Sequence, residues 1–300
     1  MAKWAVGAVL AACLAIPAEA QQRDFSKVEI KAEKLAPGVA VLIGAGGNIG
    51  LSYGEDGNAL VDDQYAPLSD RIMAAVRTID PDPVRFVINT HWHGDHTGGN
   101  ENLGKAGAVI VAHDNVRTRM SVGQVGKLGG ERRTPASPKE ALPVLTFTQS
   151  ITLHLNGDDL DVVHVAKAHT DGDSLVRWRR ANVLHMGDTF FNRISLPFID
   201  VESGWSIDGA IAAAKRGLDL SDERTRIIPG HGPVATRADL AAYVAMLEDV
   251  RTKVLAGIEA KQTLEQIKAS KPAAPYGMTD GFMSPDNFVT LVYVSLGGRP

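Results

Sequence analysis

The chain has 300 residues, of which 44% are hydrophobic and 22% are charged, and its formal net charge is −4. This composition is typical of a folded globular protein and excludes a disordered chain, which would be more polar and more highly charged. The slightly negative charge gives no support for a nucleic-acid partner and indicates no specific partner by itself; the small-molecule substrate that we expect follows from the motifs below.

The first twenty residues have the pattern of a secretory signal peptide. Lys3 supplies a positive charge, Trp4 to Ile16 form a short apolar stretch, and Ala18-Glu19-Ala20 fits a small-x-small cleavage site. The apolar stretch is shorter than the roughly 20 residues that span a bilayer, so we expect no membrane insertion of the mature chain. Leu10 to Cys13 resemble a lipoprotein signal, but the apolar residues continue past Cys13 and disfavour it. The pattern therefore predicts cleavage after Ala20 and a periplasmic or secreted protein.

Cys13 is the single cysteine of the chain, and it lies inside this predicted signal. The mature protein would contain neither a thiol nor a disulfide, so its stability would depend on core packing. Any metal site in it would have only nitrogen and oxygen ligands.

The first half of the chain alternates strand and helix patterns. Helical spacing of apolar residues predicts a helix that starts near Ser69 as its cap and ends before Pro81. Short apolar runs between glycine-rich turns predict strands at Val39 to Ile43, Leu51 to Tyr53, Ala59 to Val61, Val84 to Ile88 and Val109 to Ala112. Residues 121–143 show little periodicity, and a loop this long in a domain is usually functional or disordered, so we expect a flap over the active site.

The second half begins with strands and ends with helices. Strands are predicted at Leu145 to Phe147, Ile151 to Leu155, Leu160 to Val165, Ser174 to Trp178, Asn182 to Met186 and Thr225 to Ile228. Helices are predicted at Ile207 to Leu218 with Ser206 as cap, at Arg237 to Ile258, after Thr263, and from Ser284 and Pro285. We expect one α/β domain over 21–300, with a core at about 35–235 and a C-terminal helical extension at about 236–300. The pattern fits an αββα sandwich of two mixed sheets, although it would also allow a three-layer α/β fold.

A dense group of metal-binding residue types follows the strand Val84 to Ile88. The segment reads Asn-Thr-His91-Trp-His93-Gly94-Asp95-His96-Thr-Gly-Gly-Asn. In extended chain His91 and His93 point to the same side, and Gly94 would allow a turn that brings Asp95 and His96 to the same point. So many polar groups at the end of a buried strand would be costly without a metal, and neutral imidazole with carboxylate suits zinc.

Three further donors each follow a predicted strand and lie close to a glycine. They are His169, Asp188 and His231. Residues at strand ends commonly form active sites, and glycine permits close backbone approach. The remaining histidines of the mature chain, His113, His154, His164 and His185, are expected to be ordinary surface or core residues.

These motifs resemble the metallo-β-lactamase superfamily over residues 35 to 235. The resemblance implies the αββα fold with the site at one edge of the sandwich. It implies that His91, His93 and His169 hold one metal, that Asp95, His96 and His231 hold a second, and that Asp188 bridges both. Asp62 matches a family aspartate that orients the metal ligands without binding the metal itself, and the alternative to this role is a turn residue before the Ser69 helix.

The chemistry expected of such a site is hydrolysis by a hydroxide that two zinc ions generate near neutral pH. Asp95 would serve as the catalytic proton acceptor, as the resemblance implies. The bond attacked would be a β-lactam, lactone, ester or thioester, and β-lactam hydrolysis is an expectation to test. Many class B β-lactamases have cysteine where Asp188 stands and lysine three residues later, where this chain has Phe191. That departure favours a glyoxalase-II-like or lactonase-like centre.

Substrate contacts are expected around the Asp188 loop. Phe190, Phe191, Phe198 and Trp205 either line an apolar substrate pocket or belong to the core. Asn192 and Arg193 either bind a substrate oxygen or are solvated loop residues. Two alternatives to a zinc hydrolase stay open, namely an iron- or manganese-dependent oxidoreductase-type family member and a non-catalytic exported metal-binding accessory protein.

Overall fold

The structure is a computed structural model that describes residues 24–126, 132–198, 200, 203–278 and 280–298. The predicted signal peptide, residues 1–20, lies outside the described residues. Among the helices of the described part, none has both the length and the apolar character that crossing a bilayer demands.

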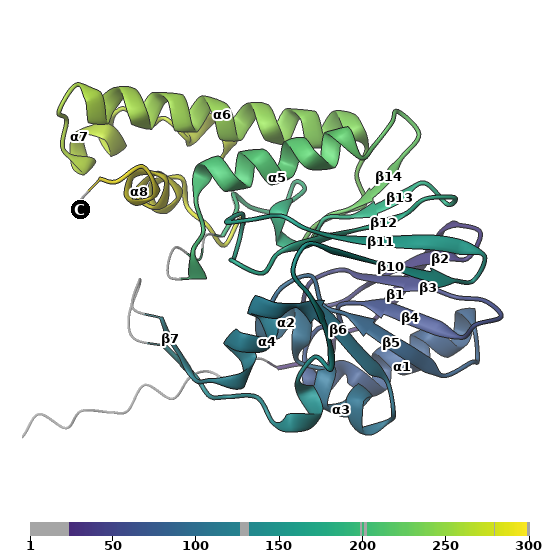
Figure 1. The fold of residues 1–300 in the computed structure, drawn as a ribbon. Helices are drawn as coiled ribbons and strands as arrows, with labels where there is room; N and C mark the ends of the chain where they lie inside the picture. The colour runs from purple at the N-terminus through teal and green to yellow at the C-terminus, as the bar shows by residue number, and fades with distance from the viewer. Residues whose placement is uncertain (1–23, 127–131, 199, 201–202, 279, 299–300) are drawn as a thin grey trace, which may run out of the picture.

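Two β-sheets pack face to face at the centre of the molecule (Figure 1). In the larger sheet the strands β1 to β4 pair antiparallel, whereas β4, β5, β6 and β9 pair parallel. Its order is β1 (Lys31–Ala36), β2 (Val39–Ile43), β3 (Ile49–Ser52), β4 (Asn58–Val61), β5 (Val84–Ile88), β6 (Val109–His113) and β9 (Leu145–Phe147). The predicted strands of the first half are therefore confirmed to within two residues.

The smaller sheet is also mixed, because only β13 and β14 are parallel. Its order is β10 (Ser150–Leu155), β11 (Asp158–His164), β12 (Ser174–Trp178), β13 (Val183–His185) and β14 (Arg226–Ile228). The apolar residues between the two sheets include Val41, Val61 and Ile88 from the larger sheet and Val162, Val176 and Trp178 from the smaller one.

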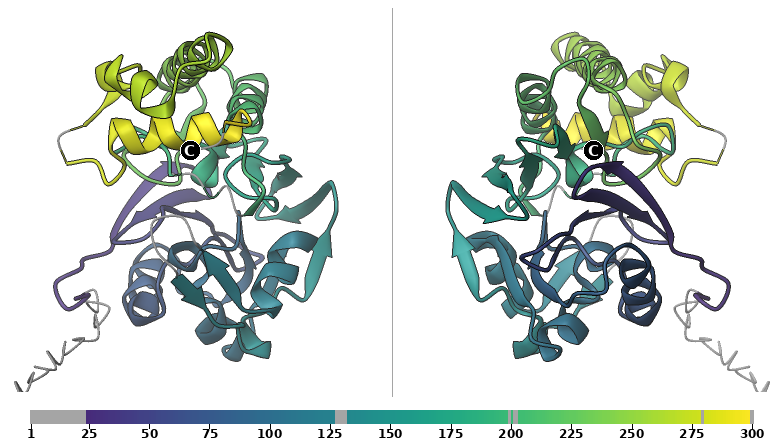
Figure 2. Two further views of the ribbon diagram at one scale, coloured as in Figure 1. Left: turned by 90° about the vertical axis from the view of Figure 1, so that its left-hand side faces the viewer. Right: turned by 90° about the vertical axis from the view of Figure 1, so that its right-hand side faces the viewer.

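Helices cover the outer face of each sheet (Figures 1 and 2). On the larger sheet α1 (Ser69–Ile79) and α3 (Asn100–Lys105) enclose a second apolar cluster that includes Ile72 and Leu103. On the smaller sheet α5 (Ile207–Asp219), α6 (Arg237–Glu259) and α8 (Pro285–Ser295) bury a third cluster, with the short α7 (Leu264–Ala269) beside them. The predicted αββα sandwich is thus confirmed, and the C-terminal helices belong to its outer layer.

Local structure differs from the sequence analysis in three places, of which two are corrected predictions and one is a strand that was not predicted. Ser69 is the first residue of α1 rather than its cap, because a 3-10 turn at Ala66–Leu68 leads into the helix and the Ser69 hydroxyl donates to Ala66 O. Residues 121–143 are not simply an irregular loop, since β7 (Gln124–Gly126) and β8 (Arg132–Thr134) form a hairpin whose turn, 127–131, lies outside the described residues. Strand β1 has a mostly exposed, polar sequence, as an edge strand can, and the apolar pattern missed it.

Candidate metal centre

The histidine-rich segment is held firmly by its neighbours in the fold. Asn89 N donates to Val111 O, and the Asn89 side chain exchanges two hydrogen bonds with Asn100. The chain then enters the short helix α2 (Gly94–Thr97). A side chain at Gly94 would meet open space and its φ is not positive, so the turn does not require the glycine that the sequence suggested.

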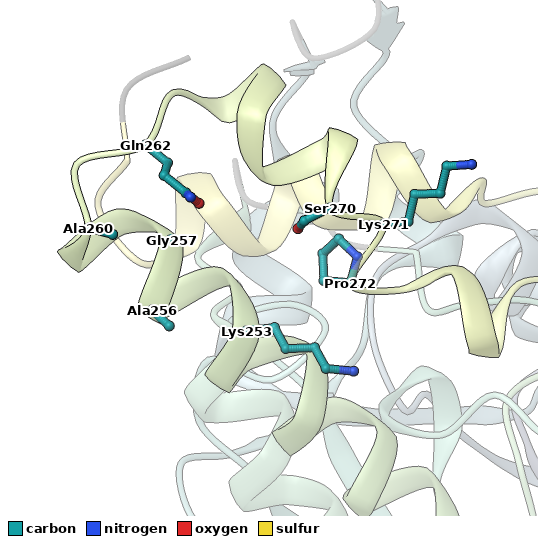
Figure 3. A pocket seen from close by; sticks show the side chains of 8 residues that line it. All are labelled: Lys253, Ala256, Gly257, Ala260, Gln262, Ser270, Lys271 and Pro272. Atoms are coloured by element: carbon teal, nitrogen blue, oxygen red, sulfur yellow. The ribbon is translucent and has the colours of Figure 1, made fainter.

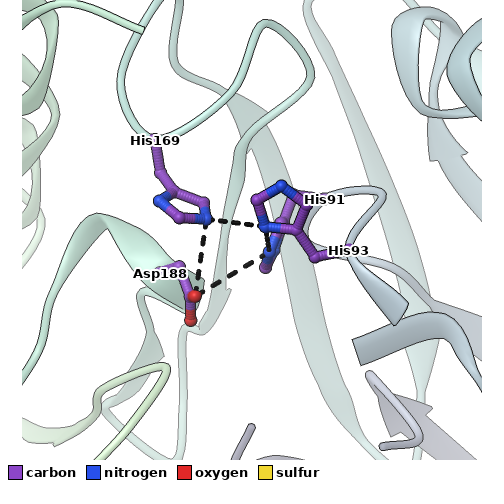
Figure 4. A group of neighbouring side chains, drawn as sticks. All are labelled: His91, His93, His169 and Asp188. Atoms are coloured by element: carbon purple, nitrogen blue, oxygen red, sulfur yellow. Dashed lines mark hydrogen bonds and ion pairs between the residues drawn. The ribbon is translucent and has the colours of Figure 1, made fainter. Parts of the chain in front are cut away.

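Four donor side chains from three loops meet at the first site (Figure 4). His93 Nδ1 lies 3.1 Å from His91 Nε2 and 2.9 Å from His169 Nε2. Asp188 Oδ2 lies 3.9 Å from His91 Nε2 and 3.4 Å from His169 Nε2. These are the residues that the sequence assigns to the first metal, together with the predicted bridge.

A second group lies directly beside the first. His231 Nε2 is 3.4 Å from His96 Nε2 and 3.3 Å from Asp95 Oδ2, and His96 Nε2 is 3.9 Å from the same oxygen. Asp188 turns its other oxygen, Oδ1, toward this group, at 3.1 Å from His96 Nε2 and 3.4 Å from His231 Nε2. The two oxygens of Asp188 therefore face two different sets of donors, as a bridging carboxylate requires.

The spacing of the donor atoms fits two tetrahedral metal ions. Four ligands at roughly 2.0–2.1 Å from a tetrahedral zinc ion lie about 3.3 Å from one another. The distances within each group, 2.9 to 3.9 Å, scatter around that value. Among the described residues the buried Asp188 Oδ1 has no properly oriented hydrogen-bond partner, despite the two imidazoles near it. The donor atoms of each group therefore lie at the spacing expected of ligands that share one metal ion.

The charges of the site also call for a cation. Burial opposes protonation of His231, but the nearby Asp188 carboxylate outweighs it and raises the pKa of His231 to about 9. Burial likewise opposes protonation of His96, whose pKa the carboxylates of Asp188, Asp62 and Asp95 nevertheless raise well above its ordinary value. In contrast, burial lowers the pKa of His169 to about 4, so this ring is neutral as a ligand must be. The raised pKa values of His96 and His231 reflect the negative charge of the surrounding carboxylates, which divalent ions would neutralise.

Asp62 lies behind the donors, where the sequence placed it. Its side chain is fully buried, Oδ1 accepts from Thr90 N at 2.7 Å, and Oδ2 accepts from the Thr90 hydroxyl at 2.7 Å. Oδ2 also lies 2.8 Å from His96 Nδ1, and the Thr90 hydroxyl lies 3.0 Å from His91 Nδ1. Because Thr90 donates its proton to Asp62, it can accept from His91, so Asp62 orients a donor of each group.

Two other carboxylates, the partly buried Asp200 and the buried Asp173, hold donors and were not singled out in the sequence. Asp200 Oδ2 lies 3.0 Å from His93 Nε2 and leaves Nδ1 of that ring free for the first site. Asp173 accepts from the backbone of His169 and Thr170, which fixes the loop that carries His169. Burial raises the pKa of Asp173 to about 8. An isolated aspartate in a loop gives no pattern from which either role could be predicted.

Glycine is required where the backbone passes close to the donors. A Cβ at Gly47 would lie 2.1 Å from the His96 ring, and one at Gly230 would lie 2.0 Å from Asp188 Oδ1. The predicted close approach of glycine to the site is therefore seen next to His231, in the segment that begins at Gly230.

The residues predicted to contact substrate lie in three different environments. Phe190 and Trp205 are buried in the core, whereas the ring centroid of Phe198 lies 6.1 Å from those of His93 and His169. Phe191 is buried and stacks on His231 at 5.4 Å. Asn192 and Arg193 have partners within the protein, since Asn192 Nδ2 donates to Pro233 O and Arg193 pairs with Asp239 at 2.5 Å. Their predicted contact with substrate remains a prediction.

The other histidines behave as ordinary residues. His185 is buried with its Nε2 3.0 Å from Asn48 O, His113 and His164 stack at 3.8 Å, and His154 is an exposed partner of Asp159.

A separate groove lies at the C-terminal end of α6, between that helix and the residues after α7 (Figure 3). Its lining residues include two lysines and none of the seven donors.

Comparisons with known proteins agree with this geometry. The family model described as "Metallo-beta-lactamase superfamily" matches residues 42–231. A hydroxyacylglutathione hydrolase from Anaeromyxobacter dehalogenans is 27% identical over 234 residues, which cover 72% of this chain and 77% of the relative. One from Polaromonas sp. is 26% identical over 207 residues, which cover 65% and 68%.

Solved structures with low sequence identity share the fold. A metallo-beta-lactamase from Pontibacter korlensis matches with a TM-score of 0.61 at 17% identity, covering 74% of this chain and all of that one. A stereoselective inverting sec-alkylsulfatase from Pseudomonas sp. matches with a TM-score of 0.64 at 16% identity. It covers 90% of this chain, which spans about half of the sulfatase.

Proposed function

The chain belongs to the metallo-beta-lactamase superfamily and is a metal-dependent hydrolase, and from this premise we propose that it is an exported dizinc enzyme that cleaves carbonyl-type bonds. The observation that carries the proposal is the position of Asp188 between two sets of donors, with one oxygen toward each. His91, His93 and His169 would hold one ion, and Asp95, His96 and His231 the other. Export rests on the signal pattern of residues 1–20.

The donor set fits zinc because it consists of imidazole and carboxylate, and because hydrogen bonds to the ring nitrogens that face away from the site orient the rings. When bound, two such ions activate water and polarise a carbonyl oxygen. The protein contributes by fixing the donors through Asp62, Thr90 and Asp200, which hold them in place before substrate arrives.

Asp95 is the residue that we assign to proton transfer. Its side chain is 26% exposed, compared with 16% for Asp200, 6% for Asp188 and none for Asp62, so it is the most exposed of these four carboxylates. A carboxylate at this position can accept the proton of the attacking water and return it to the leaving group.

The bond cleaved is proposed to be an ester, thioester, lactone or β-lactam. The curated relatives are named for hydrolysis of hydroxyacylglutathione, which makes an acyl thioester the first substrate to test. The structural similarity to a sec-alkylsulfatase concerns the fold alone, so an alkyl sulfate serves in the test only as a comparison substrate outside the proposed set.

The test is a hydrolase panel with purified, zinc-loaded protein, with and without a chelator. The panel contains nitrocefin, a lactone, an acyl thioester, an aryl ester, a phosphodiester and an alkyl sulfate. We expect turnover of at least one carbonyl substrate that the chelator abolishes and that exceeds a His91→Ala control. Turnover of none of them would refute the proposal and favour the metal-binding accessory protein.

Metal analysis after native purification separates zinc from the iron alternative, and we expect two zinc ions per chain. N-terminal sequencing of the exported protein tests the localisation, for which we expect Gln21 as the first residue.

A further inference from the structure

One aromatic side chain is exposed beside the metal centre. Among the described residues, seven large apolar side chains are exposed on the surface, and Phe282 is the one aromatic side chain in this group, with 57% of its area exposed. Its ring centroid lies 6.4 Å from that of His231 and 5.9 Å from that of Phe191. Phe282 thus presents an apolar surface to solvent next to the second group of donors.

The segment that carries Phe282 is anchored rather than loose. Met283 N donates to the hydroxyl of Ser195 at 3.0 Å, and both Met283 and Ser195 are buried. The next residue, Ser284, caps α8 through its side chain. Because both following residues are fixed, the fold holds the backbone at Phe282 next to the second group of donors, although this segment comes from the C-terminal extension.

A second aromatic ring lies beside the first group of donors. The Phe198 ring is half-buried, at 6.1 Å from both His93 and His169. Its backbone oxygen lies 3.0 Å from His169 Nδ1, which fixes the residue to the site. Each group of donors therefore has a partly exposed aromatic ring at a similar distance.

We propose that Phe282 and Phe198 form an apolar subsite that binds the hydrocarbon part of the substrate. This inference rests on the proposed hydrolysis of carbonyl compounds. A substrate whose carbonyl group reacts at the donors would lay its hydrocarbon substituent against the more exposed of the two rings, that of Phe282, with Phe198 bounding the subsite beside the first group of donors. The substrate class is accordingly an ester or thioester with an apolar acyl chain of several carbons, rather than an acetyl or a highly polar acyl group.

Chain length gives a direct test on the full-length, zinc-loaded enzyme. Full burial of one methylene group would change binding about fourfold, and a partly exposed surface captures less of this effect. We therefore expect kcat/KM for p-nitrophenyl acetate, butyrate, hexanoate and octanoate to rise about twofold per methylene. In Phe282→Ala this increase should become markedly smaller, whereas Phe282→Leu should retain most of it.

Val144→Ala is the matched control, because Val144 is also an exposed apolar residue, 66% exposed, just before β9. It should leave the chain-length dependence unchanged. Thermal unfolding of all three variants checks that each is folded.

A binding measurement distinguishes failure of the subsite from failure of the proposed function. Calorimetric titration should show that octanoate binds the zinc-loaded protein more tightly than acetate, and that Phe282→Ala removes most of the difference. If this holds while no carbonyl substrate of the hydrolase panel is turned over, the subsite stands and the proposed reaction is wrong. If esters are hydrolysed but the chain-length dependence is flat, or is equal in wild type and Phe282→Ala, the subsite is refuted and the proposed reaction stands.

Discussion

Replacing Asp62 by asparagine should weaken both metal sites at once. The Asp62 carboxylate accepts three hydrogen bonds, from Thr90 N, from the Thr90 hydroxyl and from His96 Nδ1. Through Thr90 it also orients His91, so one buried side chain supports a donor in each group. An asparagine of nearly the same shape has only one oxygen to replace two.

Neither orientation of the new amide satisfies all of these groups. With the amide oxygen toward His96, the NH₂ group faces the Thr90 N–H and one hydrogen bond is replaced by a contact between donors. With the amide reversed, the NH₂ group faces His96 Nδ1 and favours a proton on Nε2, the atom that faces the metal. The first outcome disturbs the backbone at Thr90, directly before His91, and the second leaves His96 with its proton on the wrong nitrogen.

The expected size follows from these lost bonds. Loss of an outer partner of a metal ligand commonly lowers metal affinity by about 10–100-fold. An unsatisfied buried polar group should also lower the free energy of unfolding of the metal-free protein by about 1–3 kcal/mol. Competition with a chromophoric zinc chelator measures the first quantity, and urea unfolding in the presence of a strong chelator measures the second.

Asp63→Asn is the matched control. Asp63 is equally buried, its Oδ1 accepts from Gly99 N at 2.8 Å, and its Oδ2 has no hydrogen-bond partner among the described residues. An asparagine amide can keep the one acceptor, so zinc affinity should change little. Unchanged zinc affinity in Asp62→Asn, or an equal loss in both variants, would refute this account of how the donors are oriented.

Three further predictions concern the backbone near the site, the metal and a helix cap. Gly230→Ala places a Cβ about 2.0 Å from Asp188 Oδ1, so metal analysis should find fewer than two ions per chain; two ions would show that the loop can move aside. Chelation should lower the melting temperature in calorimetry, because an ion at a thousandfold its Kd stabilises the folded state by about 4 kcal/mol; identical melting with and without chelator would contradict a metal site. At the start of α6, hydrogen bonds from the Thr236 side chain and backbone hold the pKa of Asp239 below its ordinary value. The stabilisation by Asp239 is therefore present above the unfolded-state pKa of about 3.9 and is lost as the pH falls through the lower folded-state pKa. Asp239→Asn should accordingly be less stable than wild type at pH 7 and equally stable in strong acid; a constant difference across this range would contradict the assignment.

The sequence predicted the features of the site that depend on local pattern. His91 and His93 alternate along an extended chain, and His169, Asp188 and His231 each come shortly after a strand. Because strand ends of one sandwich gather at one edge, the seven donors could be expected to meet, and the structure brings them together.

Features created by packing between distant segments could not be predicted. Asp200 is an isolated loop aspartate whose contact with His93 exists only in the folded chain. Phe282 lies next to His231 in a segment before α8 that a hydrogen bond from Met283 N to the distant Ser195 holds in place. Ser69 resembles a helix cap in sequence, but the preceding turn decides where α1 begins.

The location of Phe282 has an evolutionary consequence. The family match ends at residue 231, where the last of the seven donors stands, and Phe282 lies well beyond it. A lineage could therefore exchange the segment before α8 and acquire new substrates while it inherits the reaction centre intact. In such proteins the sequence of the C-terminal extension would vary with the substrate, whereas the histidine motif would be shared by common descent.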